Sequence, residues 1–434
     1  VCSHICLSLL SVRASEVWFR PESLDCRLRE RTECCRKGHA RDGKDFCNKI
    51  DQNRNMKKLY WAIQNLDTLG GSEMVSINLA NSLCNDFDIT LIVVSKVTNE
   101  IVYKIDPKIR IINLGINPKL VRLNNYTKKY NDQHRYLASL LLLIRSGCRM
   151  FLGRWHYRKK IKKLIDKDPG LLICSSGETY MFAPKKATKI YHYHFNSRLF
   201  FSFGDKFILA HSHKPNQFVF LSKSTRDVIV NKRKDLLNCS TYVYNPVRFE
   251  SILDTTYHNN SIAVVGRLIQ QKNPMLALGV ANELKTMNIN FKMTFYGSGA
   301  LKDEMVKYIK ENELDAFVEL VDETPGIKEA ILNSDLLLLT SIYEGYPLVK
   351  GEANALSRPI ISSNWGDTVY EIVHEGLDGY VIDSYEAKDY ALKIKELFMA
   401  KDRLKTLKKT SYESSLNCSI EKIKLKWLEI INKY

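Results

Sequence analysis

The feature that most constrains the fold is an alternation of short apolar runs, polar turns and helical patterns along residues 56–434. Short apolar runs separated by helix-length segments are typical of parallel strands joined by crossover helices. We therefore expect a doubly wound α/β protein. The predicted strands are Leu59–Leu66, Asp88–Ser95, Ile109–Leu114, Leu171–Ser175, Lys189–His194, Gln217–Ser222, Thr241–Tyr244, Ser261–Val265, Phe291–Tyr296, Phe317–Val321, Leu336–Thr340 and Pro359–Ser363.

The length of 434 residues exceeds what one hydrophobic core usually covers. Asn245-Pro246 forms a turn between two series of strands, so we predict domains at 56–245 and 246–415 and a C-terminal helix at 416–434. Basic residues are mostly Arg before Met56 and mostly Lys after it. We expect residues 1–55 to be an unstructured or non-native extension. The alternatives are a secretion signal and a small cysteine-rich metal module.

The formal net charge of +17 indicates acidic partners or a lysine-rich solvated surface. Nucleic acid is not expected, because zinc-finger spacing, RNP-like aromatic patterns and basic regions leading into heptads are absent from the sequence. It contains no Cys-x-x-Cys pair, so a metal site is not expected. Nor does it contain an uncharged apolar run of the roughly 18 residues that a membrane-spanning helix needs. We favour a phosphate-bearing ligand and an anionic membrane surface.

A helical pattern between residues 136 and 168 combines an apolar stripe with many basic residues. The stripe includes Phe151, Trp155, Ile161 and Ile165. Basic amphipathic helices with aromatic residues bind anionic membranes. An ordinary surface helix with its stripe on the core explains the same pattern, and both interpretations stay open.

Two strand ends of the first domain carry candidate binding residues. Gly70 and Gly71 follow the first strand, and Ser72 is the expected N-cap of the next helix. Glycines let a backbone approach a ligand, and the first N–H groups of a helix favour anions. A tight turn without a ligand is the alternative. His192 and His194 end the strand Lys189–His194, where a ligand crevice opens in a parallel sheet.

In the second domain, Arg267 and Lys272 leave the strand Ser261–Val265 on one loop, with Asn273 as the expected N-cap and Pro274 at the first helical position. Arginine offers a fork for phosphate and lysine a mobile charge, so this pair suits a diphosphate. Solvated basic residues would look similar. The sequence Gly297-Ser298-Gly299 follows the next strand and is a weak signal, usually of a tight turn.

Two carboxylates follow the strand Leu336–Thr340. Glu344 lies in a loop, and Glu352 comes eight residues later, in the expected first turn of a helix, where the dipole favours negative charge. Carboxylates accept hydrogen bonds from vicinal diols, as in ribose or hexose. Asp367 and Thr368 follow the last predicted strand.

Together these motifs resemble the GT-B glycosyltransferases of group 1, family 4. The resemblance covers about Met56 to the C-terminus and rests on the following residues: Gly70-Gly71-Ser72-Glu73, His194, Val265-Gly266-Arg267-Leu268, Lys272-Asn273, Gly297-Ser298-Gly299, Glu344 and Glu352. It implies two Rossmann-like domains facing across a cleft. It also implies sugar transfer with retention from a nucleotide-diphosphate sugar, such as a UDP- or GDP-sugar, without a metal or a bound cofactor.

The resemblance implies roles for these residues. Arg267 and Lys272 would hold the diphosphate and stabilise the departing charge. Glu352 would bind the ribose, Glu344 the transferred sugar, and His194 would lie near the reacting centre. Donor contacts are likewise implied for Gly70, Gly71, Gly297, Ser298, Gly299, Asp367 and Thr368.

The sequence departs from the family pattern at Asp367 and at Ser357 or Arg358, where glycines are frequent. The departure at Asp367 leaves the identity of the donor open. The leading hypothesis is a peripheral enzyme of the cytoplasmic membrane face that builds capsule or lipopolysaccharide on a glycan or lipid-linked acceptor. A sugar-nucleotide epimerase or hydrolase and a non-catalytic carbohydrate-binding partner of a transferase are the alternatives.

Overall fold

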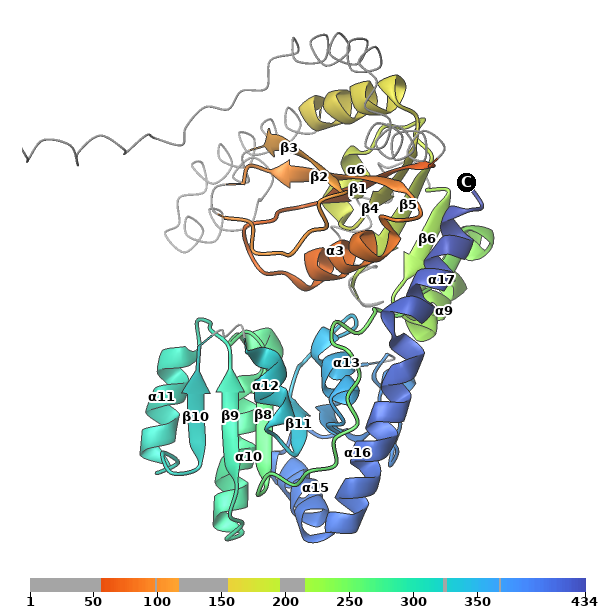
Figure 1. Ribbon diagram of the computed structural model, residues 1–434. Helices are drawn as coiled ribbons and strands as arrows, with labels where there is room; N and C mark the ends of the chain where they lie inside the picture. The colour runs from red at the N-terminus through yellow and green to blue at the C-terminus, as the bar shows by residue number, and fades with distance from the viewer. Residues whose placement is uncertain (1–55, 98–99, 117–154, 196–214, 323–325, 367) are drawn as a thin grey trace, which may run out of the picture. The chain divides into compact units, whose positions relative to one another are not determined.

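The computed structural model describes residues 56–97, 100–116, 155–195, 215–322, 326–366 and 368–434. The predictions for residues 1–55, for Asp367 and for the helical pattern before Trp155 lie outside these residues. Within them, the chain builds two separate β-sheets with every strand pair parallel (Figure 1). This confirms the predicted α/β class.

The first sheet has the strand order β3-β2-β1-β4-β5-β6-β7. Its strands are β1 (Lys58–Ile63), β2 (Asp88–Ser95), β3 (Arg110–Ile116), β4 (Leu171–Cys174), β5 (Lys189–Tyr193), β6 (Gln217–Phe220) and β7 (Ser240–Tyr242). The helical segments among them are α3 (Gly71–Leu83), residues 155–167, α6 (Gly177–Phe182), α9 (Lys223–Lys232) and the 3-10 helix η2 (Lys234–Cys239).

The second sheet has the strand order β10-β9-β8-β11-β12-β13. Its strands are β8 (Ser261–Val265), β9 (Lys292–Tyr296), β10 (Val318–Val321), β11 (Leu336–Leu339), β12 (Ile360–Ser363) and β13 (Gly379–Ile382). The helical segments are η3 (Gln270–Lys272), α10 (Pro274–Thr286), α11 (Lys302–Glu311), α12 (Ile327–Leu332), α13 (Leu348–Ala355), α14 (Val369–Ile372), α15 (Ala387–Met399), α16 (Lys401–Ser415), η4 (Leu416–Cys418) and α17 (Ile420–Ile431).

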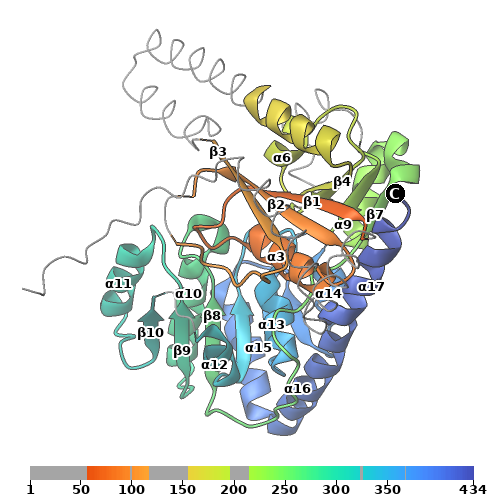
Figure 2. The same cartoon turned by 45° about the horizontal axis from the view of Figure 1, so that its top comes forward.

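Both sheets are covered by helices on their two faces, as their continuous apolar strands require. In β1, Trp61 packs into one core cluster with α3, and its neighbour Tyr60 packs into another with helix 155–167. Figure 2 shows these two helices on opposite sides of β1 and β2. In β11, Leu338 faces α10, α11, α15 and α16, whereas Leu337 faces α12, α13 and α14.

The last helix packs on the first sheet. Trp427 of α17 is fully buried, and its ring centroid lies 5.6 Å from that of Trp61 in β1. Three isoleucines of α17, Ile423, Ile430 and Ile431, join the same core cluster as α3. The end of the chain therefore completes the core that its first strand begins.

Several local predictions were wrong. Helix α3 begins at Gly71 with Gly70 as its N-cap, so Ser72 is not the cap. Glu352 is the fifth residue of α13 and thus lies beyond its first turn. Strand β13 was not predicted, because its four residues GYVI follow a polar, glycine-containing turn. The N-cap Asn273 and Pro274 at the start of α10 are confirmed, although the Asn273 side chain forms no capping bond.

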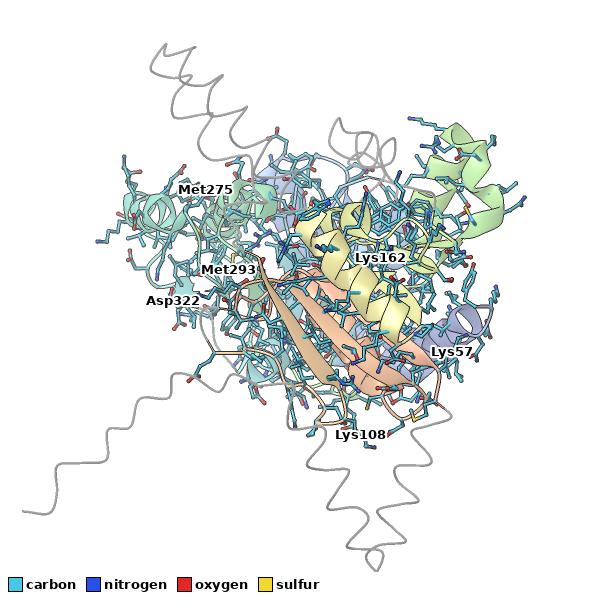
Figure 3. All side chains as sticks on the ribbon, turned by 90° about the horizontal axis from the view of Figure 1, so that it is seen from above. Lys57, Lys108, Lys162, Met275, Met293 and Asp322 are labelled. Carbon is cyan, nitrogen blue, oxygen red and sulfur yellow. The ribbon has the colours of Figure 1, made fainter. Side chains whose placement is uncertain are left out.

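The described part of the basic helical pattern, residues 155–167, agrees with the interpretation as a surface helix. Tyr157 and Ile161 are fully buried, and Leu164 and Ile165 pack against the same cluster, so the apolar stripe faces the core. Trp155, the aromatic residue of the stripe that the structure describes, is exposed. Lys162, labelled in Figure 3, lies on the exposed basic side of this helix. Among the described residues, no helix is long and apolar enough to cross a membrane.

Candidate active site

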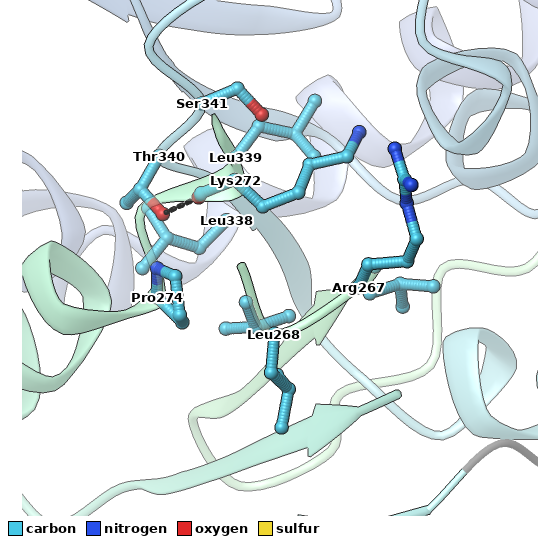
Figure 4. A pocket seen from close by; sticks show the side chains of 11 residues that line it. Arg267, Leu268, Lys272, Pro274, Leu338, Leu339, Thr340 and Ser341 are labelled. Carbon is cyan, nitrogen blue, oxygen red and sulfur yellow. Dashed lines mark hydrogen bonds between the residues drawn. The ribbon is translucent and has the colours of Figure 1, made fainter. Parts of the chain in front are cut away.

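The predicted basic loop borders a pocket at the carboxyl ends of β8 and β11 (Figure 4). Arg267 and Lys272 line the pocket, and in the close-up their cationic ends point into the same space. The Lys272 stem lies over Gly266, where an added Cβ would be 3.6 Å from Cδ and Cε of the lysine. The remaining lining residues are Val264, Val265, Gly266, Leu268, Pro274, Leu338, Leu339, Thr340 and Ser341.

An ion pair joins the two predicted halves of the site. Lys272 Nζ lies 2.5 Å from Glu344 Oε1, which also accepts a hydrogen bond from Ser341 Oγ at 2.7 Å. The Glu344 side chain is 9% exposed and that of Lys272 is 22% exposed, so water screens this pair less than a surface pair. The hydroxyl of Thr340 donates to the Lys272 carbonyl at 3.1 Å. The loop after β8 is thus fastened to the loop after β11.

The glycines of Gly297-Ser298-Gly299 support the basic loop through the backbone. A Cβ on Gly297 would lie 2.1 Å from the Gly266 carbonyl oxygen, and one on Gly299 would lie 2.2 Å from that of Leu268. The Leu268 N–H donates to the Ser298 carbonyl at 2.8 Å. Side chains at 297 and 299 would separate the loops, so both glycines have a structural reason independent of any ligand.

Glu352 is nearly buried on α13 and pairs with a residue that the sequence reading did not single out. Arg248 Nε lies 3.0 Å from Glu352 Oε1. Burial raises the pKa of Glu352 above the usual value for a glutamate, and the Arg248 charge opposes that rise. The carboxylate of Glu352 is therefore ion-paired, as is that of Glu344, but each pairs with a cation from a different segment.

His194 comes directly against the Glu344 loop. A Cβ on Gly345 would lie 2.4 Å from the His194 carbonyl oxygen, so the two backbones touch. The His194 Nε2 atom is buried and has no hydrogen-bond partner among the described residues. Burial lowers the pKa of His194 to about 3, which leaves the ring neutral at physiological pH. The His192 ring lies beside it, with the ring centroids 4.0 Å apart and the planes tilted by 52°.

The N-terminal glycine turn also reaches α13. The Gly70 N–H donates to the Tyr103 hydroxyl at 2.7 Å, which fixes the turn. A Cβ on Gly71 would be 3.8 Å from Leu348 Cδ1, an ordinary contact with the first residue of α13. Gly71, at the start of α3, therefore contacts the helix that carries Glu352, at Leu348, four residues before the glutamate.

Thr368 lies apart from the pocket, in a network of hydroxyl groups. Its Oγ1 atom lies 3.1 Å from Thr225 Oγ1 and 3.3 Å from Ser222 Oγ, at the start of α9. The neighbouring Glu371 accepts hydrogen bonds at 2.7 Å from the backbone N–H groups of Lys223 and Ser224. Burial would raise the pKa of Glu371, but these bonds outweigh it and hold the pKa below its usual value. These contacts connect the loop after β12 to α9.

The structure therefore brings Arg267 and Lys272 to one pocket, pairs Lys272 with Glu344, and places His194 against the Glu344 loop. It adds Ser341 and Arg248, which the sequence reading missed. Ser341 follows a predicted strand directly, and this position was a usable signal; for Arg248 no sequence signal was available. Among the described residues, no cluster of three or more histidine, cysteine or acidic side chains is arranged to hold a metal ion.

Comparison with known proteins shows similarity to glycosyltransferases. Residues 254–414 match the family Glycosyl transferases group 1. The chain is 24% identical over 382 residues to the amylovoran biosynthesis glycosyltransferase AmsD of Erwinia amylovora, covering 87% of this chain and 100% of that protein. A GalNAc-α-(1->4)-GalNAc-α-(1->3)-diNAcBac-PP-undecaprenol α-1,4-N-acetyl-D-galactosaminyltransferase of Campylobacter jejuni is 23% identical over 382 residues, covering 87% and 98%.

A solved glycosyltransferase structure is similar to this one in fold. A variant of S. aureus TarM, in complex with fondaparinux, α-GlcNAc-glycerol and UDP, matches with a TM-score of 0.70 at 17% identity. The match covers 87% of this chain and 100% of TarM. The two parallel sheets and this similarity define a protein of the GT-B fold, which confirms the predicted architecture. The match over residues 254–414 shows that this part of the chain is similar to the group 1 glycosyltransferases.

Proposed function

We propose that this protein is a retaining glycosyltransferase of family 4. It moves a hexose from a nucleotide-diphosphate sugar to a lipid-linked or polysaccharide acceptor. The observation that carries the proposal is the Lys272–Glu344 pair beside Arg267. This arrangement offers two cations for a diphosphate and one carboxylate for sugar hydroxyls. The UDP in the TarM complex favours UDP over GDP as the nucleotide, and the glycans named for the two relatives favour a cell-surface product.

In the proposed reaction, the bond from the anomeric carbon to the β-phosphate oxygen breaks, and the acceptor oxygen bonds to the same face of that carbon. The acceptor proton passes to the departing phosphate oxygen, so the nucleoside diphosphate leaves. Arg267 and Lys272 stabilise the negative charge that develops on the phosphate, where preorganised cations are most effective. This charge comes from the chain itself, and the proposal assigns no metal.

Glu344 and Glu352 are proposed to bind hydroxyl groups and not to act as an acid–base pair. Glycoside hydrolases place an acid and a second carboxylate on either side of one bond. Here each carboxylate is already paired with a cation, Lys272 or Arg248, and remains a hydrogen-bond acceptor. Glu344 would hold the transferred sugar and Glu352 the ribose.

The remaining roles follow from position. His194 would lie near the reacting sugar, because it contacts the Glu344 loop and its buried Nε2 has no partner among the described residues. Gly70 and Gly71 would face the donor from the N-terminus of α3, and Gly297, Ser298 and Gly299 from the turn after β9. Thr368 would contact the donor from the loop after β12, and its hydroxyl group also lies 3.1 Å from Thr225 Oγ1.

A peripheral position on the cytoplasmic face of a membrane is also proposed. Helix 155–167 exposes Trp155 and several lysines, including Lys159, Lys162 and Lys163. Because the apolar stripe is buried, attraction would come from charge and from one tryptophan, not from insertion of a helix face. Neutralising Lys159, Lys162 and Lys163 should weaken co-sedimentation with anionic liposomes, whereas unchanged sedimentation would refute the proposed membrane contact.

The proposal is tested with a panel of UDP-, GDP- and ADP-sugars in a thermal-shift assay. A donor that binds only the folded protein raises the melting temperature, and we expect a UDP-sugar to give the largest rise. Transfer to lipid-linked acceptors is then measured with that donor, and the anomeric configuration of donor and product is compared by NMR. Inversion would exclude the retaining assignment.

The alternatives predict other outcomes of the same assay. A sugar-nucleotide epimerase or hydrolase would convert the donor alone to an epimer or to free sugar, with no acceptor present. A non-catalytic partner would bind carbohydrate or nucleotide but turn over no donor. Acceptor-dependent transfer by the purified chain would exclude both.

A further inference from the structure

The segment that follows β7 runs along α13, the helix that carries Glu352. A Cβ on Gly351 of α13 would lie 3.4 Å from Val247 Cγ2, so these two segments are in contact. Arg248 comes next, and its Nε atom lies 3.0 Å from Glu352 Oε1. Consecutive residues of the segment thus meet consecutive residues of the helix, which places the guanidinium group in register with the carboxylate.

Other bonds hold this segment in place. The Val247 N–H donates to the Cys418 carbonyl at 2.8 Å, in the short η4 helix before α17. The Asn245 side chain donates to the Tyr346 carbonyl at 3.4 Å. Because a backbone bond at Val247 and a side-chain bond at Asn245 hold the segment, the fold determines where Arg248 leaves the backbone.

We propose that Arg248 is a positioning residue for the nucleotide, which occupies one oxygen of Glu352 and leaves the other to accept hydrogen bonds from the ribose. This inference rests on the proposed function, in which Glu352 binds ribose. The Arg248 side chain is 29% exposed and that of Glu352 is 8% exposed, so the pair lies at the boundary between solvent and core. An arginine suits this place, since its fork orients a carboxylate as well as neutralising it.

Two lysines of this domain, Lys350 and Lys272, are paired with other carboxylates, whereas Arg248 pairs with Glu352. Lys350 on the same helix pairs with Asp378 at 3.2 Å, and Lys272 pairs with Glu344 at 2.5 Å. Burial raises the pKa of Glu352, and Arg248 is the charge that opposes this rise. Without it the carboxyl group would take up a proton at higher pH and lose acceptor capacity for the ribose.

The test compares the full chain with its Arg248→Met and Arg248→Lys variants, using UDP as the probe. The dissociation constant of UDP is measured by calorimetry between pH 5.5 and 8. We expect Arg248→Met to bind UDP about tenfold more weakly at pH 6, a difference of about 1.4 kcal/mol, with a smaller loss at pH 8. The fall in UDP affinity toward acid pH, the acid limb of the affinity profile, should shift to higher pH in Arg248→Met. Arg248→Lys should reverse part of this shift. In transfer assays, KM for the donor should rise more than kcat falls.

Arg233→Met is the matched control. Arg233 pairs with Asp235 on an exposed part of the chain, so this change removes the same charge elsewhere. A merely structural role of Arg248 would lower the melting temperature and weaken binding equally at all pH values. An acid limb unchanged from wild type in Arg248→Met would overturn the inference and leave the proposed function intact. Failure of the unaltered protein to bind UDP would refute both the choice of UDP and the role of Glu352.

Discussion

The backbone carbonyl of His194 lies so close to Gly345 that a Cβ on this glycine would be 2.4 Å from the oxygen. His194 follows β5 of the first sheet, and Gly345 directly follows Glu344. The glycine therefore permits a backbone contact between the histidine and the carboxylate loop. This contact joins two elements of the predicted site.

Gly345→Ala should damage both activity and stability. The added methyl group meets a backbone atom, which cannot rotate away, so one of the two loops must move. We expect a loss of about 1–3 kcal/mol in the free energy of unfolding, as for overpacked sites, and a larger relative loss of transfer activity. Gly351→Ala is the control, because its nearest contact of 3.4 Å is far less tight. A wild-type melting temperature for Gly345→Ala would contradict the contact.

Lys272→Ala and Glu344→Ala should each lower the rate of transfer by at least about a hundredfold, the scale of losing one charge-stabilising contact. The ion pair between them makes each loss greater, since the remaining charge is left partly buried. Single-turnover kinetics with a saturating donor would measure the effect on the chemical step. Ser341→Ala removes only the hydroxyl group that donates to Glu344, so it should lower the transfer rate less. Near-wild-type rates in both main variants would refute the site assignment.

The stability of the protein should fall as the pH drops from about 7 to 5, in part because of His192. Its ring is buried beside His194 and Trp427, and burial, followed by the electrostatic interaction with neighbouring His194, lowers its pKa well below the usual 6.5. The unfolded chain therefore binds more protons than the folded chain below pH 6.5. Each such histidine adds a slope of up to about 1.4 kcal/mol per pH unit.

His192→Asn should make that pH dependence shallower, as measured by urea unfolding at several pH values. His156→Asn is the control, since His156 is exposed on helix 155–167. An unchanged slope in His192→Asn would mean that the folded protein binds a proton at His192 in this range.

Asp254→Ala should destabilise the second sheet by about 3 kcal/mol, because it leaves the buried guanidinium of Arg358 without its carboxylate. Arg358 also donates to the Asp254 carbonyl and to the carbonyl groups of Ile331 and Leu332, which the variant retains. Thermal unfolding measures the loss. Asp235→Ala, which removes the partner of exposed Arg233, should change stability far less.

The sequence predicts the strands well where the apolar run is continuous. Asp88–Ser95 was predicted with the bounds that β2 has, because residues buried on both faces leave an unbroken hydrophobic signal. The edge strand β13 was missed, because its four residues GYVI form only a short apolar run after a polar, glycine-containing turn. Pro347 places the start of α13 at Leu348, and this boundary moved Glu352 from the expected first turn to the second.

The departures from the family pattern have local explanations that sequence alone does not provide. Ser357 adopts a left-handed conformation with φ of 60°, which glycine favours, and its hydroxyl donates to the Ile252 carbonyl. Arg358 fills the adjacent space with a fully buried side chain. The residues that replace these glycines, like the pairing of Arg248 with Glu352, make contacts between segments that are distant in the sequence. Such contacts follow from the tertiary structure and cannot be predicted from local sequence patterns.

The position of Trp427 has a consequence for the order in which the protein can be made. The N-terminal sheet is synthesised first, but its core contains Trp427 and three isoleucines of the last helix. Trp427 also lies 4.9 Å, between ring centroids, from His192, next to the predicted catalytic histidine. Domains usually fold as they emerge during synthesis. Here the first half cannot cover its hydrophobic face until translation has reached the final helix, so a ribosome that stalls before Ile420 would release an enzyme with an unfinished core.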